Sequence, residues 1–431
     1  MSKKNGLKKL FAQIEINPIA LLSLFKKKRS KQILSLYVSM ILGLITGIMV
    51  SVINTRFLKP ELYGDFKFLQ TFCSFIVTFL TLGIFYSGGR LVAKKNNEQI
   101  KNEIIGGTLI AGLLISILFM TIIFNVSFLE ELIFKNSLGY TFRIFIPLLI
   151  VYPFEMFCEN LLQGDNKIFS LSIFRLGPKI LYLVIVPLYH FYISPLSLNS
   201  AFSIYLISMG VFILFSINSL KPKLKNTKQN LLLIWTENRS YGFPVYVGAL
   251  ASIASSQFGG ISISFFVDNT NVGFFSLAVT ASLPLTLIPS VVGTAFFKDF
   301  SNMKEIPLKI TIYTLLLSAI SLMGFILIIR PMVIFLYSSA YLAVIPLAYL
   351  TSIGSTFHGY GDYINRFLSA QGKGKVLRNT SFAIGISNIL GYTILIYFFG
   401  VYGAALTKLI SGILYSGFMI YYYRKLKFSE F

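Results

Sequence analysis

The sequence predicts an all-α integral membrane protein, with about twelve transmembrane helices in two parallel-repeat bundles of six around a central cavity. Three observations lead to this fold class. Of the 431 residues, 55% are hydrophobic and only 13% are charged, and the mean hydropathy is +0.74. Apolar runs of about 20 residues, the length that crosses a bilayer as a helix, recur along the chain. Similar segments also recur in its two halves.

Twelve apolar runs qualify as spans by length and composition. The first is too long for a signal-peptide core, and no small-residue cleavage pattern follows it, so we interpret it as a retained span. In order, the runs are Ile33–Thr55, Phe68–Ser87, Ile104–Phe124, Ile144–Leu162, Phe169–Ile193, Asn199–Leu220, Phe243–Val267, Gly273–Phe297, Leu308–Ile329, Val344–Leu368, Val376–Phe399 and Val401–Tyr423.

The net charge of +22 is distributed in a way that favours bilayer orientation over nucleic-acid binding. Most of the 38 Lys and Arg residues fall before the first span, after the last, or in every second loop. Because basic loops remain in the cytoplasm, both termini are expected there. Arg56, Lys67 and Arg330 are among the few basic residues expected on the outer side.

Two pairs of segments indicate an internal duplication. "FLKPELYGDF" aligns with "FVDNTNVGFF", which matches Gly64 with Gly273. "YPFEMFCENLLQGDNK" aligns with "YGDYINRFLSAQGKGK", which matches Gly164 with Gly372 at nearly the same offset. An offset of six helices preserves membrane orientation, so the halves are expected to be parallel repeats. Rocking of two such bundles about a central cavity is a common geometry of alternating-access transport.

The predicted organisation has five parts. The linker "KPKLKNTKQNLLLIWTENRSYG" is expected to form a short interfacial helix that carries Trp235, the only tryptophan. The N-terminal segment is basic and apolar, which fits either a segment lying on the anionic inner leaflet or a basic tail that sets topology. The parts are a basic segment 1–32, a bundle 33–220, the linker 221–242, a second bundle 243–423 and a tail 424–431.

Four charged residues inside the fourth and fifth spans are expected to meet. Glu155 and Glu159 lie one helical turn apart, as do Arg175 and Lys179. If the hairpin turns near Asn166, Glu159 reaches the depth of Arg175, and Glu155 that of Lys179. Charges within a bilayer are expensive, so such residues pair, line a pathway, or do both. A purely structural pairing remains an equal alternative.

The other candidate charges are more scattered. Asp362 and Arg366 lie one turn apart in the tenth span, and Lys408 lies well inside the twelfth. Arg90 ends the second span, where it is either a topology signal or part of the cavity. Together with Arg175 and Lys179, the cations Arg90, Arg366 and Lys408 form the expected cationic site. Glu155, Glu159 and Asp362 are expected to balance their charge or couple an ion.

The sequence offers little for catalysis, metal binding or disulfides. Both cysteines, Cys73 and Cys158, lie inside spans, so no disulfide framework is expected. The two histidines suggest no metal-ligand cluster and no cofactor. "GKGK" lacks the spacing and the preceding strand of a phosphate-binding loop. The outer connections are short, and "FLEELIFK", with Glu130 and Glu131, reads as a solvated turn, so an enzyme is not expected.

The dispersed pattern of the chain resembles the polysaccharide transporter family of bacterial flippases, within the superfamily that also contains multidrug and toxin extruders. The resemblance runs from about Ile33 to Tyr423 and rests on "TRFLKPELYGDFKFLQ", "YGFPVYVGALASIASSQFGGISISFFVDNTNVGFFSLAV", "LTLIPSVVGTAFFKDFS" and "GDYINRFLSAQGKGKVLRN". It implies translocation of oligosaccharide repeat units on an undecaprenyl pyrophosphate carrier from the inner to the outer leaflet, for O-antigen (lipopolysaccharide), capsule or another polymer.

The resemblance also implies the partners. These are the lipid-linked oligosaccharide, membrane lipids and other polysaccharide-assembly proteins such as a polymerase, but no nucleic acid. A cationic cavity would suit the anionic pyrophosphate. Two alternatives remain, a multidrug antiporter of the same superfamily and, less favoured, a polytopic polymerase or glycosyltransferase of the pathway.

Overall fold

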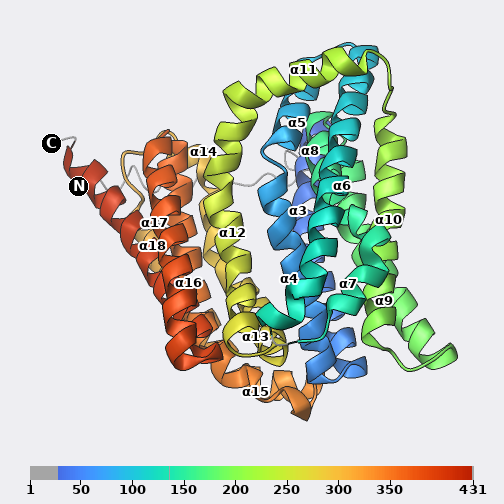
Figure 1. The fold of residues 1–431 in the computed structure, drawn as a ribbon. Coiled ribbons are helices and arrows are strands. Elements are labelled where there is room, and N and C mark those ends of the chain that lie inside the picture. The colour runs from blue at the N-terminus through green and yellow to red at the C-terminus, as the bar shows by residue number, and fades with distance from the viewer. Residues whose placement is uncertain (1–27, 135, 430–431) are drawn as a thin grey trace.

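The predicted all-α membrane fold is confirmed by the computed structural model, which describes residues 28–134 and 136–429 (Figure 1). Side chains are described at 41–134, 136–250 and 255–426. No strand occurs in these residues. Most of the predicted N-terminal segment, residues 1–27, lies outside the described part, so its expected contact with the inner leaflet stays a prediction.

The first half of the chain forms the six spans expected there, although two of them consist of more than one helix. The helices are α3 (Lys28–Phe57), α4 (Pro60–Leu80), α5 (Ile84–Lys94), α6 (Glu98–Phe134), α7 (Gly139–Phe145), the short 3₁₀ turn η1 (Ile146–Ile150), α8 (Val151–Gly164), α9 (Ile168–Tyr192) and α10 (Leu198–Leu220).

The second half follows a linker that is itself helical, as expected from its sequence. The linker contains α11 (Thr227–Glu237) and the π-helical turn η2 (Asn238–Gly242). The helices of the second half are α12 (Phe243–Phe266), α13 (Asn269–Ala295), α14 (Phe297–Phe300), α15 (Leu308–Leu336), η3 (Ser339–Tyr341), α16 (Val344–Ala370), α17 (Gly374–Phe399) and α18 (Val401–Ser429).

Length and hydropathy support most of these spans directly. Within the described residues, 8 helices are long and apolar enough to cross a membrane, or up to 10 if each bent pair counts as one span. Of the remaining two expected spans, α3 counts only as a shorter apolar helix over Ile41–Phe57. The other is α16, which carries Asp362, Arg366 and many hydroxyl side chains. Its polarity is therefore the exception that needs a functional reason.

The second predicted span is broken rather than continuous. Helices α4 and α5 meet at a bend of 65°. Leu82 and Gly83 at the break both have positive φ, and a Cβ on Gly83 would come within 2.3 Å of the carbonyl oxygen of Gly242. The bend therefore lets the start of α12 approach the backbone of α4 and α5, a close approach that only glycine permits.

The two halves touch through α4, which packs against both α12 and α13. Gly64 and Gly273, the matched glycines of the two repeats, lie against each other: a Cβ on Gly273 would be 3.0 Å from the Cα of Gly64. Beside them, the Nδ2 of Asn269 donates to the Oδ1 of Asp65 at 2.8 Å. At the same end of the molecule, Arg56 donates to backbone carbonyls at the end of α15. These contacts hold the two halves together at this end of the molecule.

The second pair of repeat segments matches in a register different from that of the sequence letters. The backbone N–H of Lys167 donates to the carbonyl of Leu162 at 2.9 Å, and that of Lys373 donates to Leu368 at 3.0 Å. Lys167 therefore corresponds to Lys373 in the turn, and the register through Gly164 and Gly372 was wrong by two residues. The identical residues of the two segments gave the wrong register, because the two turns share their backbone conformation but not their residue types.

The predicted solvated turn around Glu130 was also wrong. Helix α6 continues for 37 residues, to Phe134, and Glu130 is fully buried. Its Oε2 accepts a hydrogen bond from the backbone N–H of Leu138 at 3.1 Å. The carboxylate therefore ties the end of α6 to the start of α7, because buried backbone donors need a partner.

Candidate functional site

The hairpin of α8 and α9 brings Glu159 and Arg175 together. The Nε of Arg175 lies 2.9 Å from the Oε1 of Glu159, and the two side chains are 37% and 43% exposed. Lys167 and the turn after Gly164 reverse the chain, so that residues one or two turns from each helix end face each other. The carboxylate of Glu159 is therefore neutralised within the hairpin.

Lys179, one turn further along α9, has a different partner. Its Nζ donates to the backbone carbonyl of Gly43 on α3 at 3.1 Å. A Cβ on Gly43 or Gly47 would lie about 4 Å from this ammonium. Because both residues are glycines, the ammonium reaches the α3 backbone without a side chain in between. The charge of Lys179 interacts with that of Glu155, but no ion pair between them forms among the described side chains. Lys179 is exposed and able to meet a ligand.

Sequence reasoning missed Lys67, which it placed with the outer basic residues. Lys67 lies inside α4, two turns after the helix begins at Pro60, and its ammonium is 5.6 Å from the centre of the Tyr63 ring. Its charge interacts with that of Lys179. The signal that was available is Pro60, because proline at the first helical position marks a helix start well before Lys67.

We define Lys67, Glu155, Glu159, Arg175 and Lys179 as the N-terminal charged group. Three cations and two carboxylates from α4, α8 and α9 give it a formal charge of +1. Helix α4 also packs against α12 and α13 of the second half. The group therefore combines an excess of positive charge with a position beside the junction of the halves.

The second half encloses a cavity of about 390 Å³ between α12, α13, α16, α17 and α18. Four serines, an asparagine, a histidine and three aromatic rings line it, together with Asp362 and Lys408. This volume lies in the range of small-molecule sites, about 300 to 1,000 Å³. We call it the C-terminal cavity. Sequence reasoning identified its two charges, but not the hollow between them.

Inside the C-terminal cavity, Asp362 is held by a tyrosine. The hydroxyl of Tyr415 donates to the Oδ1 of Asp362 at 2.9 Å, and Asn365 donates to the same hydroxyl oxygen at 2.8 Å. His358 stacks on the Tyr415 ring with their centroids 4.4 Å apart. The charges of Asp362 and Lys408 attract each other, although no ion pair of Lys408 forms among the described residues.

Arg366 and Arg90 lie outside the C-terminal cavity and apart from each other. Arg366 is exposed, and its stem packs beside Gly293 of α13. Arg90 forms an ion pair of 2.9 Å with Glu237 of the linker and lies over the ring of Tyr241 at 4.0 Å. The structure therefore places the five expected cations in four regions and not around one hollow.

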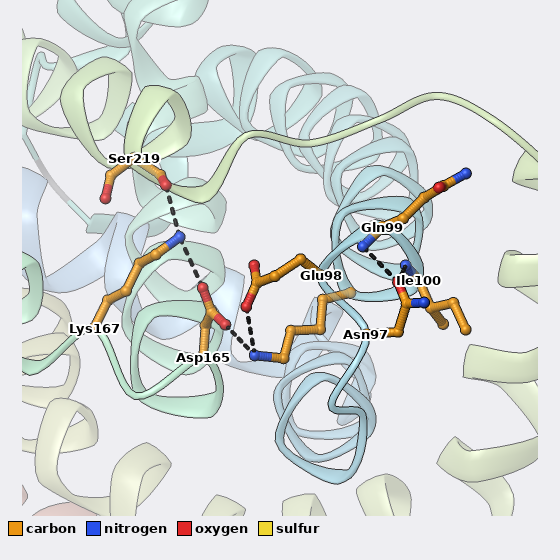
Figure 2. Close-up of polar contacts among 8 residues, drawn as sticks. Asn97, Glu98, Gln99, Ile100, Asp165, Lys167 and Ser219 are labelled. Carbon is orange, nitrogen blue, oxygen red and sulfur yellow. Dashed lines mark hydrogen bonds and ion pairs between the residues drawn. The ribbon is translucent and has the colours of Figure 1, made fainter.

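A further ion-pair cluster, where the ends of α6, α8 and α10 meet, provides a contrast (Figure 2). The nearly buried carboxylate of Asp165 lies 3.1 Å from the ammonium of Lys101 and 2.7 Å from that of Lys167. Lys167 also donates to the carbonyl of Ser219 at 2.7 Å. This cluster joins the ends of α6, α8 and α10, so its lysines have a structural role besides any effect on topology.

Comparisons with known proteins agree with this architecture. A family model described as "Polysaccharide biosynthesis protein" matches residues 30–304. No curated protein sequence matches the chain.

Solved structures of similar fold are transporters and a flippase. A lipid II flippase in an inward closed conformation aligns with a TM-score of 0.66 and 18% identity, over 92% of this chain and 90% of that chain. A multidrug resistance MATE family transporter of the MOP superfamily, in an inward-facing conformation, aligns with a TM-score of 0.67 and 15% identity, over 92% and 98%. An outward-facing MATE transporter structure aligns with a TM-score of 0.58 and 16% identity, over 94% and 97%.

Proposed function

The chain belongs to the polysaccharide biosynthesis protein family, and from this premise we propose that it is a flippase for undecaprenyl-pyrophosphate-linked oligosaccharide repeat units. It would move them from the inner to the outer leaflet of a bacterial plasma membrane by alternating access of the two halves. Its multi-pass membrane fold, which it shares with a lipid II flippase and MATE transporters, supports a transport role.

The N-terminal charged group is the observation that carries this proposal. A pyrophosphate is a compact anion that strong charge-assisted hydrogen bonds recognise well. Lys67, Arg175 and Lys179 supply such donors, and Glu155 and Glu159 limit the positive charge so that the substrate can leave. The lipid tail can remain in the bilayer while the headgroup contacts these residues, which suits a carrier that is polar at one end only.

The remaining expected residues take roles in the second half and at the inner entrance. Lys408 and Asp362 contact the polar headgroup from the C-terminal cavity, and Asp362 balances the lysine charge or couples an ion. Arg366 and Arg90, which are partly or fully exposed, attract the anionic carrier from the inner leaflet. No catalytic step is proposed. Membrane lipids and a polymerase remain the expected partners.

A multidrug antiporter is the alternative within the same fold. Such a protein needs an acidic or apolar site for its cationic drugs. The N-terminal charged group carries a net positive charge, and the wall of the C-terminal cavity carries both Asp362 and Lys408, so neither region offers the acidic site that a cationic drug needs. The charges therefore favour an anionic substrate.

The test is lipid translocation by the full-length protein in liposomes. The probe is fluorescent undecaprenyl pyrophosphate carrying a short glycan, whose outer-leaflet fraction is measured by chemical quenching. We expect the wild type to translocate it and Arg175→Gln to do so about tenfold more slowly, since a charge-assisted hydrogen bond contributes roughly 1.5 to 3 kcal/mol. Arg330→Gln, the same change at an exposed arginine on α15, is the matched control.

Two results would contradict the proposal. One is equal translocation by the wild type and Arg175→Gln. The other is no translocation of the lipid together with proton-driven efflux of ethidium, which would favour the antiporter.

A further inference from the structure

We propose that the C-terminal cavity binds one neutral sugar unit of the glycan and that it thereby contributes to substrate selection. This inference rests on the proposed function and goes beyond it, because it separates recognition of the sugar from recognition of the pyrophosphate. The N-terminal charged group binds the part that every carrier shares, and the C-terminal cavity reads the part that differs between glycans.

The chemistry of the cavity wall suits a ligand rich in hydroxyl groups. Asp362 and Lys408 have opposite charges, so the ionised wall has no net charge and does not favour an ion of either sign. The Asp362 carboxylate accepts hydrogen bonds, the Lys408 ammonium donates them, and the four serine hydroxyls can do both. A sugar hydroxyl donates and accepts as well, so it can pair with each of these groups.

One wall atom has no partner in the described structure. The Oδ1 of Asn388 is buried and accepts no hydrogen bond. Asn388 lies on α17 and lines the C-terminal cavity. An unpaired buried acceptor is costly, so a ligand hydroxyl that donates to it gains free energy that the empty cavity lacks.

Aromatic rings complete the wall. Phe275, Tyr392 and Tyr415 line the same cavity from α13, α17 and α18. Binding sites for small molecules commonly combine such rings with a few oriented polar groups. A pyranose ring has one face of C–H groups and a rim of hydroxyls, so it fits a wall that offers both kinds of surface.

The position of the cavity allows one substrate to reach both sites. Helices α12 and α13, which wall the cavity, also pack against α4, the helix that carries Lys67. The contact is close: a Cβ on Gly260 of α12 would lie 2.9 Å from the Cγ2 of Thr71, one turn beyond Lys67 on α4. A headgroup bound beside Lys67 therefore lies near the helices that enclose the cavity.

The family match covers only part of the cavity wall. The match ends at residue 304, and ten of the 14 lining residues lie beyond it. The whole N-terminal charged group lies within it. The match therefore includes the whole pyrophosphate site proposed above but only the α12 and α13 part of the cavity wall.

The experiment compares two lipids with the full-length protein in lipid nanodiscs. One is undecaprenyl pyrophosphate, and the other is the repeat-unit lipid extracted from cells that make the protein. We expect the wild type to bind the sugar-bearing lipid at least about tenfold more tightly, because each satisfied hydrogen bond changes affinity by roughly two- to tenfold. Ser411→Phe, which fills the cavity, abolishes that preference and leaves the affinity for the bare carrier unchanged.

Three further variants make the result decisive. Ile410→Phe, next to Ser411 but 42% exposed, is the matched control and keeps the preference. Asn388→Ala removes one acceptor and reduces the preference about threefold, and it decides the question if Ser411→Phe fails to fold. Arg175→Gln weakens binding of both lipids equally.

The outcomes separate this inference from the proposed function. Equal binding of both lipids by the wild type would overturn the sugar site, as would a preference that survives in both cavity variants. In either case the pyrophosphate site stands if Arg175→Gln still weakens both lipids. If Arg175→Gln weakens neither lipid, the proposed pyrophosphate site is wrong, whatever the cavity variants do.

Discussion

The two halves of the molecule treat their charged residues differently. Six ion pairs between described side chains lie in the first half and the linker, among them Arg90 with Glu237 and Arg175 with Glu159. In the second half, Asp362 and Lys408 face a cavity, and Arg366 is exposed. The first half thus pairs several of its charges with one another, whereas the second half places two opposite charges in the wall of a polar cavity.

This difference separates charges that maintain the fold from charges that need another reason. A charge within the bilayer region costs free energy unless a partner compensates it. Glu159 has Arg175, and Asp165 has two lysines, so their retention can be explained by the fold alone. Lys408 has no ion pair in the described structure. Its retention inside α18 therefore needs a reason other than pairing, as does that of the lysines of the N-terminal charged group, which also form no ion pair there.

The largest effect is expected from removing the lysine of the C-terminal cavity. Lys408→Met leaves Asp362 without the cation that shares its cavity, and an uncompensated charge there costs about 2.5 to 3.5 kcal/mol. Because Lys408 also donates charge-assisted hydrogen bonds of roughly 1.5 to 3 kcal/mol to the headgroup, we expect translocation per folded molecule in liposomes to fall by roughly 100-fold. The double variant Asp362→Asn with Lys408→Met should restore the amount of protein in the membrane but not translocation. Unchanged translocation by Lys408→Met would show that Lys408 is no more important for function than the paired charges of the first half.

The comparison is sharpened by exchanging the charges of the first half. Arg175→Glu sets a second carboxylate against Glu159, and translocation should fall by about tenfold, since both side chains are partly exposed and solvent screens them. Adding Glu159→Arg restores the pair with its charges exchanged. Recovery of protein stability without recovery of translocation would show that the position of the cation matters. If neither protein stability nor translocation recovers, Glu159 and Arg175 do not act as an independent ion pair.

The sequence predicted the parts of the molecule that depend on local composition. The spans followed from hydropathy because each must bury about 20 apolar residues. The meeting of Glu159 with Arg175 followed from helical spacing across a short hairpin. The position of Lys408 inside the last helix followed from the apolar run that surrounds it. Each of these needs only one element or two adjacent ones.

Features that depend on how distant helices pack were not predictable in this way. The break at Gly83 is required by the approach of Gly242, which lies far away in the sequence. The C-terminal cavity requires five helices to present their polar faces to one another. Lys67 was assigned to the outer side because the start of α4 was placed at Phe68 and not at Pro60. A single sequence contains no signal for helix rotation strong enough to decide such questions.

The smallest effect on translocation is expected from the ion-pair cluster of Figure 2, which tests the other side of the comparison. Asp165→Asn removes the carboxylate between Lys101 and Lys167, so the free energy of unfolding should fall by about 1 to 3 kcal/mol. Translocation per folded molecule should not change, because these lysines hold helix ends together. Thermal unfolding in detergent and translocation in liposomes measure the two quantities separately. Glu98→Gln, at a side chain 72% exposed, is the matched control and should change neither. A loss of translocation with an unchanged free energy of unfolding would mean that Lys101 and Lys167 contact the substrate. That result would contradict the purely structural role given to this cluster.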